Sequence, residues 1–396
     1  MRTAALVVAV LVVLAGCSAP VPPSHGDAAV RDDHEIRDVA VENGSIPVNA
    51  TALYGTVARM LETDARAPGR IVLEPNSAMG IAREPMPPFF QIMGVDRPPG
   101  ATRAATALGY VADPSTVHLN RNLVDDPEQV RLTLVHEYVH VVQGRTDAGE
   151  ALRENVPDPN TTDGTMVRTS VLEGVAVGVE TAYWNRTVDD GMSPAAGMEA
   201  SYEATDGVRQ WLYARYHFGY EYVQARTTTL AGADSLYASP PRTTEELLHR
   251  LPPGTEPMPP LSVDVRSAEW NRNGTDRLGE LFVRVALDTE LDANRSRTAA
   301  AGWGVDRRVA VTDGSETGYV WALRWDDAAN ATEFHAAMRA YLDDRATRRE
   351  GVWEDGDATF ALHRVGTETV VVTMGPASFV REAGVDGTNA NVVVRV

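Results

Sequence analysis

Lysine is absent from this chain of 396 residues, and all 36 of its basic side chains are arginine. Acidic side chains number 55, so the formal net charge is −19. Proteins that bind nucleic acid use clustered positive charge to displace counterions from the phosphate backbone. The charge balance therefore argues against nucleic acid as a partner.

An excess of acid without lysine also resembles the composition of proteins from extreme halophiles. Carboxylates spread densely over a surface keep it hydrated in strong brine, while the salt screens their mutual repulsion. We interpret the acidity as a means of staying soluble and not as the mark of a binding site.

Cysteine occurs once, at Cys17, so the chain cannot form an internal disulfide bond. Residues 14–17 (LAGC) resemble a lipobox, the cleavage and lipidation site of exported lipoproteins. A lipid thioether would account for a lone cysteine in an exported protein. The alternative is an ordinary secretory signal with an incidental cysteine.

No apolar run in the sequence is long enough to span a bilayer comfortably. The run from Ala4 to Ala15 follows the basic residue Arg2 and has the length of the apolar part of a signal peptide. We predict a lipoprotein signal peptide over residues 1–16 and a membrane anchor through lipid at Cys17. The expected location is the extracellular face of the cell membrane.

Seven Asn-x-Ser/Thr sequons follow the predicted signal peptide. Background frequencies of serine and threonine would give roughly two among this many asparagines. The excess is typical of an exported, glycosylated surface protein. The glycosylation candidates are Asn43, Asn49, Asn160, Asn185, Asn273, Asn294 and Asn330.

The hydrophobic pattern divides the remaining chain into parts. Residues 17–45 are rich in small and polar side chains and indicate a flexible tether. About 350 further residues are long for one core, so we predict two domains, over 46–262 and 263–396. The Pro-rich stretch 251–261 is the expected linker between them.

Periodicity gives the expected elements. Helices are predicted at 50–61, 127–143, 165–184, 200–228, 278–287, 293–301 and 327–345. Strands are predicted at 70–74, 108–112, 116–120, 309–312, 319–325, 358–364 and 368–373. Residues 147–164 are expected to form a polar loop. The fold class is therefore α+β: a mainly helical first domain with a small sheet, then a smaller α+β domain.

One helix carries the chemistry. His136 and His140 are four residues apart, so both imidazoles lie on one helix face and can reach one metal ion. Glu137 lies beside that face, where it can polarise a metal-bound water. This is the H-E-x-x-H signature of zinc-dependent peptidases. The alternative is a core helix whose histidines bond to backbone carbonyls.

A catalytic zinc ion normally takes three protein ligands, and Glu173 is the best third candidate. It lies in an almost entirely apolar helix, where a buried carboxylate is costly unless a metal or partner offsets it. Gly174 is expected to let this helix approach the motif helix closely. Glu180, on the same face, is either a partner of a ligating histidine or a residue at the solvent-exposed rim. Competing ligands are His217, His249, Glu154 and Asp147.

These motifs resemble the gluzincin clan of zinc metallopeptidases, and more narrowly a set of exported gluzincin-like proteins. The resemblance lies in segments 134–143, 172–176, 216–223 and 241–249, and we expect it to extend to 302–307. Two positions depart from the pattern: Val175 replaces an acidic residue, and Arg215 replaces a proline. The resemblance implies Zn²⁺ as cofactor.

The implied activity is hydrolysis of peptide bonds in peptides or surface proteins, with Glu137 as base and then acid. An oxyanion donor is also needed, and Tyr216 is the first choice, with His217 second. Both are placed by the resemblance and by the next aromatic-rich helix. The alternative function is a non-catalytic, zinc-containing surface lipoprotein that acts as a binding or structural module.

Overall fold

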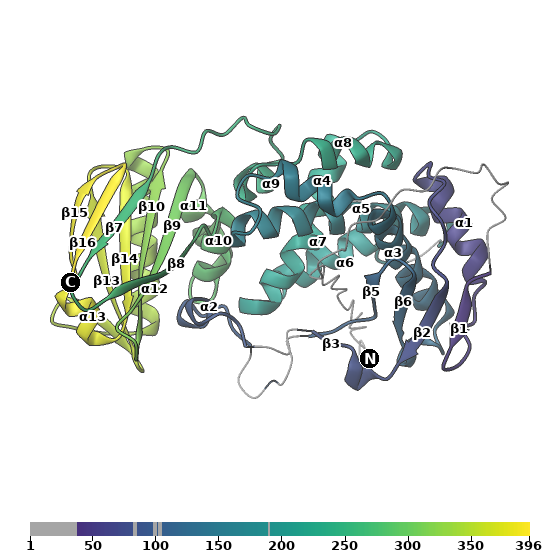
Figure 1. Cartoon of the computed structure of the whole chain (residues 1–396), viewed down its shortest axis with the longest axis horizontal. Coiled ribbons are helices and arrows are strands. Elements are labelled where there is room, and N and C mark those ends of the chain that lie inside the picture. The colour runs from purple at the N-terminus through teal and green to yellow at the C-terminus, as the bar shows by residue number, and fades with distance from the viewer. Residues whose placement is uncertain (1–37, 82–84, 98–100, 102–104, 189–190) are drawn as a thin grey trace, which may run out of the picture.

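The computed structural model describes residues 38–81, 85–97, 101, 105–188 and 191–396. The predicted signal peptide, Cys17 and most of the predicted tether lie outside the described residues. The described chain is elongated, with helices and a small sheet at one end and a larger β-structure at the other (Figure 1). The predicted α+β fold is confirmed. None of the described helices has both the length and the apolar character needed to cross a membrane.

A four-stranded sheet lies beside the predicted metal helix. Its order is β1-β2-β6-β5, in which the first three strands are parallel and β5 is antiparallel to β6. β5 is therefore an edge strand, and it packs against α3. The strands are β1 (Ala40–Glu42), β2 (Arg70–Glu74), β5 (Gly109–Asp113) and β6 (Thr116–Asn120).

Helix α3 (Pro127–Arg145) carries the H-E-x-x-H motif. The Asp126 side chain accepts hydrogen bonds from the backbone N–H groups of Glu128 and Gln129, and a proline occupies the first helical position. Every residue from Thr133 to Gln143 is buried. A helix that is buried on all sides belongs to the core, so the motif is enclosed by protein.

The other two long helices of this part are α5 (Thr162–Thr187) and α7 (Gly207–Arg226). α5 packs against both α3 and α7. Around them lie α1 (Ala50–Met60), α2 (Pro88–Ile92), α4 (Ala148–Asn155), α6 (Pro194–Glu203), α8 (Ala233–Ala238) and α9 (Thr244–Leu248). A two-stranded ladder joins β3 (Gly80–Ile81) to β4 (Ala105–Thr106), and 3-10 turns span Asn76–Ala78, Arg121–Leu123 and Leu230–Gly232.

The C-terminal part is built on an antiparallel seven-stranded sheet of order β11-β12-β13-β14-β10-β9-β8. A three-stranded sheet, β15-β16-β7, shares an apolar cluster with one face of it. The strands are β7 (Ser262–Arg266), β8 (Asn271–Asp276), β9 (Trp303–Thr312), β10 (Thr317–Trp325), β11 (Thr347–Arg349), β12 (Val352–Asp355), β13 (Ala358–Val365), β14 (Thr369–Gly375), β15 (Gly384–Thr388) and β16 (Asn391–Arg395). The helices are α10 (Glu280–Asp288), α11 (Ala293–Ala300), α12 (Ala328–Arg345) and α13 (Ala377–Glu382).

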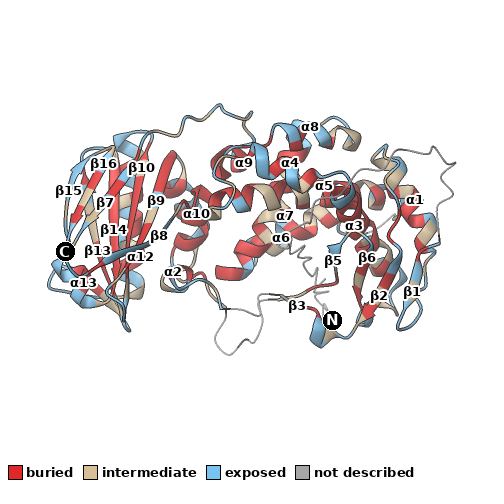
Figure 2. Ribbon diagram, viewed as in Figure 1, coloured by how far each residue is buried: buried red, intermediate tan, exposed pale blue. Residues whose placement is uncertain are grey.

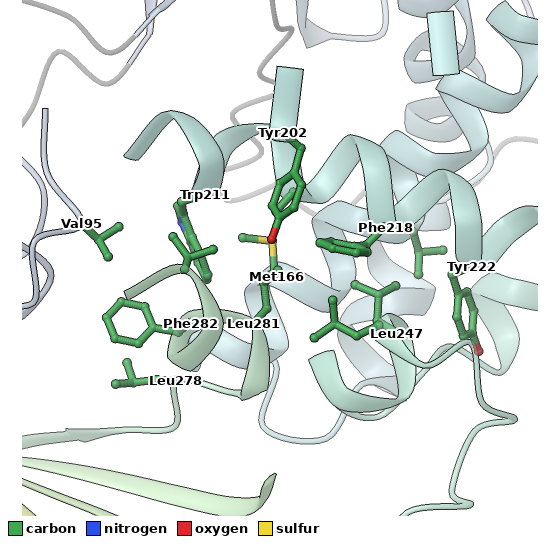
Figure 3. Packing of buried hydrophobic residues seen from close by; sticks show 14 of the residues in the cluster. Val95, Met166, Tyr202, Trp211, Phe218, Tyr222, Leu247, Leu278, Leu281 and Phe282 are labelled. Carbon is green, nitrogen blue, oxygen red and sulfur yellow. The ribbon is translucent and has the colours of Figure 1, made fainter. Parts of the chain in front are cut away.

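The largest apolar cluster runs from the small sheet through the helices to the seven-stranded sheet. Buried residues accordingly form a continuous band in Figure 2. At its middle, Phe89 of α2 contacts Phe282 of α10 and the edge of Trp321 of β10. Figure 3 shows Phe282 and Trp211 in the same cluster. Their ring centroids lie 5.9 Å apart. Apolar side chains from before and after residue 262 therefore pack in one cluster. The domain boundary at that residue stays a prediction.

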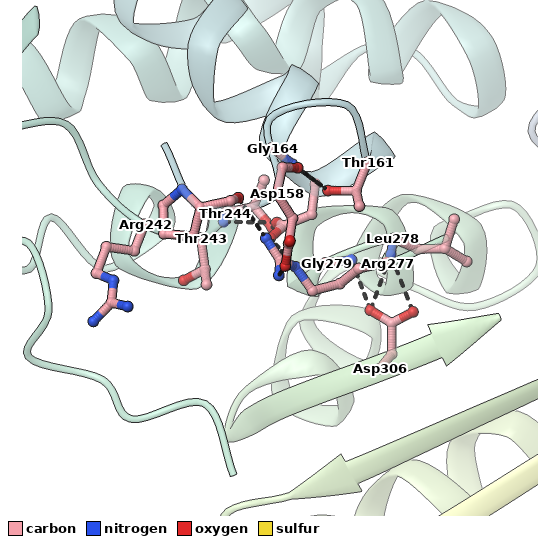
Figure 4. A network of polar contacts seen from close by, with 12 residues as sticks. Asp158, Thr161, Gly164, Arg242, Thr243, Thr244, Arg277, Leu278, Gly279 and Asp306 are labelled. Carbon is pink, nitrogen blue, oxygen red and sulfur yellow. Dashed lines mark hydrogen bonds and ion pairs between the residues drawn. The ribbon is translucent and has the colours of Figure 1, made fainter. Parts of the chain in front are cut away.

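Buried polar contacts reinforce this junction (Figure 4). The Asp163 carboxylate, at the start of α5, accepts hydrogen bonds from Thr244 of α9 and from the Arg277 guanidinium before α10. Asp306 of β9 accepts from the backbone N–H groups of Leu278 and Gly279. Buried charges need such partners, so these contacts fix the start of α5 against the C-terminal sheet.

Two predicted elements are wrong in outline. The polar stretch 147–164 contains α4, whose only buried residues are Ala148 and Leu152, so most of its sequence is hydrophilic. The single helix predicted at 200–228 is two helices, α6 and α7, separated by residues 204–206. The break falls at Thr205-Asp206-Gly207, residue types that favour turns over continued helix.

Candidate metal centre

His136 and His140 point from one face of α3 toward Glu173 of α5. The Glu173 Oε2 atom lies 3.3 Å from His136 Nε2 and 3.1 Å from His140 Nε2. The three side chains are 2%, 5% and 3% exposed, respectively, for His136, His140 and Glu173. Their ligand atoms lie within 4.8 Å of one another, so this buried group can hold a metal ion.

The outer nitrogen of each imidazole is also engaged. His136 Nδ1 lies 3.1 Å from Glu180 Oε2, and His140 Nδ1 lies 2.8 Å from Gln143 Oε1. If each Nδ1 carries the proton and donates it to these oxygens, each Nε2 presents a lone pair to the centre. Glu180 is therefore a buried partner of His136 and not a rim residue, which settles the two alternatives left open by the sequence.

Gln143 is itself held in place. Its Nε2 donates to the Leu172 carbonyl of α5 at 2.9 Å and contacts the Tyr237 hydroxyl of α8 at 3.1 Å. With both donor hydrogens used, the side-chain oxygen is oriented toward His140. These hydrogen bonds connect His140 through Gln143 to helices α5 and α8. The spacing of residues in the sequence did not predict this connection.

The three ligand candidates strongly affect one another's protonation. Burial alone would lower the pKa of His136, but hydrogen bonds to Glu173 and Glu180 raise it to about 10. Burial would raise the pKa of Glu173, but the charge of His140 and the hydrogen bonds of both histidines lower it to about 2. In the metal-free protein, Glu173 is thus a carboxylate that favours cationic partners, whether protons on the histidines or a metal ion.

Glu137 is fully buried, and neither of its carboxylate oxygens has a hydrogen-bond partner within the described chain. Burial raises its pKa to about 7. Gly109 of the edge strand β5 packs directly on it: a Cβ at that position would lie 2.9 Å from Glu137 Oε1. An unpartnered buried carboxylate with a pKa near neutrality is suited to accept and return a proton.

Tyr216 of α7 also lies at this centre, close to Glu173. Its ring centroid lies 6.1 Å from that of His136, and its buried hydroxyl makes no hydrogen bond of good geometry in the described structure. Burial, followed by the Glu173 charge, raises its pKa well above the ordinary value. The hydroxyl therefore stays protonated and available as a donor.

His217 lies on a different face of α7 and stacks on Tyr202, with ring centroids 5.4 Å apart. Burial and the charge of Arg284 lower its pKa to about 4. Among the competing ligands, His249 bonds to Glu280 at 3.0 Å, while Asp147 and Glu154 are exposed. The structure does not bring these four residues to the His136–Glu173 group.

Gly174 was expected to allow close approach of its helix to the motif helix α3, but its close neighbour is α7. A Cβ at Gly174 would lie 2.2 Å from the backbone of Gly219 in α7, and one at Gly219 would lie 2.0 Å from the Ser170 carbonyl. The two glycines therefore allow close contact of α5 with α7, and not of α5 with α3. This contact brings Tyr216, three residues before Gly219, close to Glu173, the candidate ligand carried by α5.

The predicted glycosylation sites are placed at the surface with one exception. Asn330 is half-buried, and its side-chain amide donates to the Ala301 carbonyl. The exposed asparagines are Asn43, Asn49, Asn160, Asn185, Asn273 and Asn294. Exposure is compatible with modification, which stays a prediction.

Comparisons with known proteins reach only the C-terminal part of the chain. A family model described as a domain of unknown function (DUF8575) is similar to residues 266–383, which include the seven-stranded sheet. No curated protein and no solved structure matches the chain. The His136, His140 and Glu173 group lies outside the matched residues.

Proposed function

We propose that this protein is a zinc-dependent peptidase, with the gluzincin-like arrangement that its motifs resemble, held at the extracellular face of the membrane by lipid on Cys17. One observation carries the catalytic part of the proposal. Two imidazole nitrogens and one carboxylate oxygen converge in a buried group, next to the unpartnered carboxylate of Glu137. The lipid anchor rests on the sequence of residues 14–17 alone.

The donor set supports zinc in particular. Ligands about 2.0–2.1 Å from a tetrahedral ion are about 3.3 Å apart. The two His–Glu173 separations of 3.3 and 3.1 Å match that spacing. Two histidines and one glutamate leave a fourth position for water, the usual composition of a catalytic and not a structural zinc site.

A bound zinc ion would supply Lewis-acid activation of a water molecule and of the scissile carbonyl. Glu137 would take a proton from that water and return it to the leaving amine. The protonated hydroxyl of Tyr216 would donate to the oxyanion that develops on the carbonyl oxygen. Glu180 and Gln143 would keep both imidazoles oriented throughout.

The position of β5 supports a peptide as substrate. An edge strand offers backbone donors and acceptors to which an extended peptide can add as a further strand. β5 ends the order of its sheet, and its first residue, Gly109, lies on Glu137. A peptide aligned along this strand would therefore pass close to the proposed base.

The test begins with residues 18–396 purified in molar salt. Elemental mass spectrometry should find close to one zinc per chain in the wild type, and almost none in Glu173→Ala. Glu137→Gln should retain zinc but lose hydrolysis of a broad peptide library by a factor of about 10²–10⁴. Glu154→Gln, which changes an exposed glutamate, should match the wild type in both measurements. Equal hydrolysis by wild type and Glu137→Gln would disprove the proposed base.

The alternative function, a zinc-containing binding module without turnover, is favoured by one observation. None of His136, Glu137, His140 and Glu173 is more than 5% exposed, whereas a catalytic site must admit a substrate. A cavity of about 530 Å³ is lined instead by residues such as Arg59, Gly178 and Arg186. Stoichiometric zinc without cleavage of any library peptide would favour this alternative.

A further inference from the structure

A second group of acidic side chains lies at the junction between the helical part and the seven-stranded sheet. Glu245 belongs to α9, Glu256 to the Pro-rich segment that follows, and Asp326 comes directly after β10. One carboxylate oxygen from each lies within 4.8 Å of the others. The three residues are far apart in sequence and converge only in the folded chain.

Glu245 is a nearly buried carboxylate beside other acids. It is 5% exposed, no hydrogen bond or ion pair joins its carboxylate to the described residues, and the charged groups that affect it most are acidic, led by Glu280 and Asp326. Nearby acids are already engaged: Glu280 bonds to His249, and Asp163 bonds to Arg277. A buried carboxylate without a partner is costly, so its place beside two other carboxylates calls for a cation.

The arrangement is also held in advance by its neighbours. Glu246, the next residue of α9, accepts hydrogen bonds from the backbone N–H groups of Gly254 and Glu256. The backbone N–H of Asp326 donates to the Gly302 carbonyl. These bonds fix the backbone at Glu256 and Asp326 while leaving their carboxylates directed at Glu245. Preformed geometry of this kind lowers the cost of ordering ligands around an ion.

We propose that Glu245, Glu256 and Asp326 form a calcium-binding site that joins α9 to the seven-stranded sheet. The ligands are all carboxylate oxygens, which hard cations prefer and which differ from the nitrogen-rich donors of the metal centre. Calcium accepts irregular arrangements of oxygen ligands, whereas magnesium demands a near-ideal octahedron, so three carboxylates fixed by separate elements suit calcium better. The exposure of Asp326 and partial exposure of Glu256 leave room for water to complete the coordination.

The test uses the full-length protein, purified in detergent and treated with a chelator. Calcium or magnesium is then added at equal concentration in the same molar NaCl background, and thermal unfolding is followed. Calcium should raise the unfolding temperature of the wild type by roughly 5 °C, and magnesium by much less. The calcium shift should disappear in Glu245→Gln and persist in the control Glu382→Gln, an exposed glutamate on α13.

Folding of the key variant is itself informative. Glu245→Gln replaces a nearly buried acid that lies among other acids with a neutral amide of the same shape, so without calcium it should unfold at the same temperature as the wild type or higher. Terbium luminescence gives a second measurement: one ion that calcium displaces should bind to wild type and to Glu382→Gln, and not to Asp326→Asn. Equal calcium shifts in wild type and Glu245→Gln, or no shift in the wild type, would overturn the proposal.

Discussion

Glu173 and Glu245 are both helical glutamates that are at least 95% buried, yet their carboxylates behave in opposite ways. Two histidines lower the pKa of Glu173 to about 2, whereas burial, followed by the charges of nearby acids, raises that of Glu245 to about 10. Burial is nearly the same, so the partners decide the direction. Glu173 has basic partners within the protein, whereas the charged groups that affect Glu245 most, among the described residues, are acids.

The largest expected difference between the two sites is in zinc affinity. If the roughly 10–16 kcal/mol of a structural zinc site is shared among four ligands, removing one costs about 3 kcal/mol, or a factor of about 10². Glu173→Gln should therefore weaken zinc binding by at least that factor in a competition titration with a chelator. The same substitution at Glu245 should leave the zinc affinity unchanged. Equal losses would mean that the two sites are not independent.

pH should separate the sites next. The pKa of His136 is raised to about 10, so its imidazole is cationic in the metal-free protein at neutral pH, and the pKa of His140 is raised as well. Zinc must displace any such proton, so its affinity should fall roughly tenfold per pH unit for each proton released as pH decreases. Calorimetry in buffers of different ionisation enthalpy would count the protons. A zinc affinity that is flat between pH 8 and 6 would contradict the protonation assigned to the histidines.

A smaller effect should follow from changing the hydrogen bond behind the first ligand. Glu180→Gln removes the charged partner of His136 Nδ1 without removing a ligand. Substitutions of this kind typically cost 10–100-fold in metal affinity. The zinc titration used for Glu173→Gln measures it, with the exposed Glu154→Gln as control. An affinity unchanged from the wild type would show that Glu180 does not orient the imidazole.

The smallest expected effect is on stability at the acidic group. Because the folded pKa of Glu245 is above its ordinary value, this group costs stability as pH rises above about 4.5, and the cost stops growing near pH 10. In chelator, the wild type should lose about 1–3 kcal/mol of unfolding free energy over this range that Glu245→Gln does not lose. Urea unfolding at pH 5 and pH 9 gives the difference. Parallel pH profiles for the two proteins would remove the electrostatic argument.

The grouping of His136, His140 and Glu173 was predictable from the sequence because its signals are local. Two histidines at helical spacing and one acid in an apolar helix are unusual as buried residues, and one shared metal site would explain all three. Glu180 could be placed on the correct face but not beside His136, because its burial depends on how α5 packs against α3.

The acidic group escaped prediction because its members have no common pattern in the sequence. Glu245, Glu256 and Asp326 come from a helix, a loop and a strand end that meet only through tertiary packing. Strand β8 was not predicted either. Its residues are almost all exposed, so its sequence shows no alternation of apolar and polar side chains. Its identity as a strand comes from pairing with β9, which sequence periodicity cannot register.

The ion pair between Asp163 and Arg277 has a practical consequence for the design of truncated fragments of this protein. A fragment ending near residue 262 would keep all three metal ligands but lose Arg277, leaving the Asp163 carboxylate with only Thr244 as a partner. It would also remove Phe282 and Trp321, the two aromatic residues beyond residue 262 that Phe89 contacts. The first turn of the helix that carries Glu173 would thus lose its packing and its ion pair. If such a fragment were inactive or aggregated, the cause would be the missing sheet and not the chemistry of the centre.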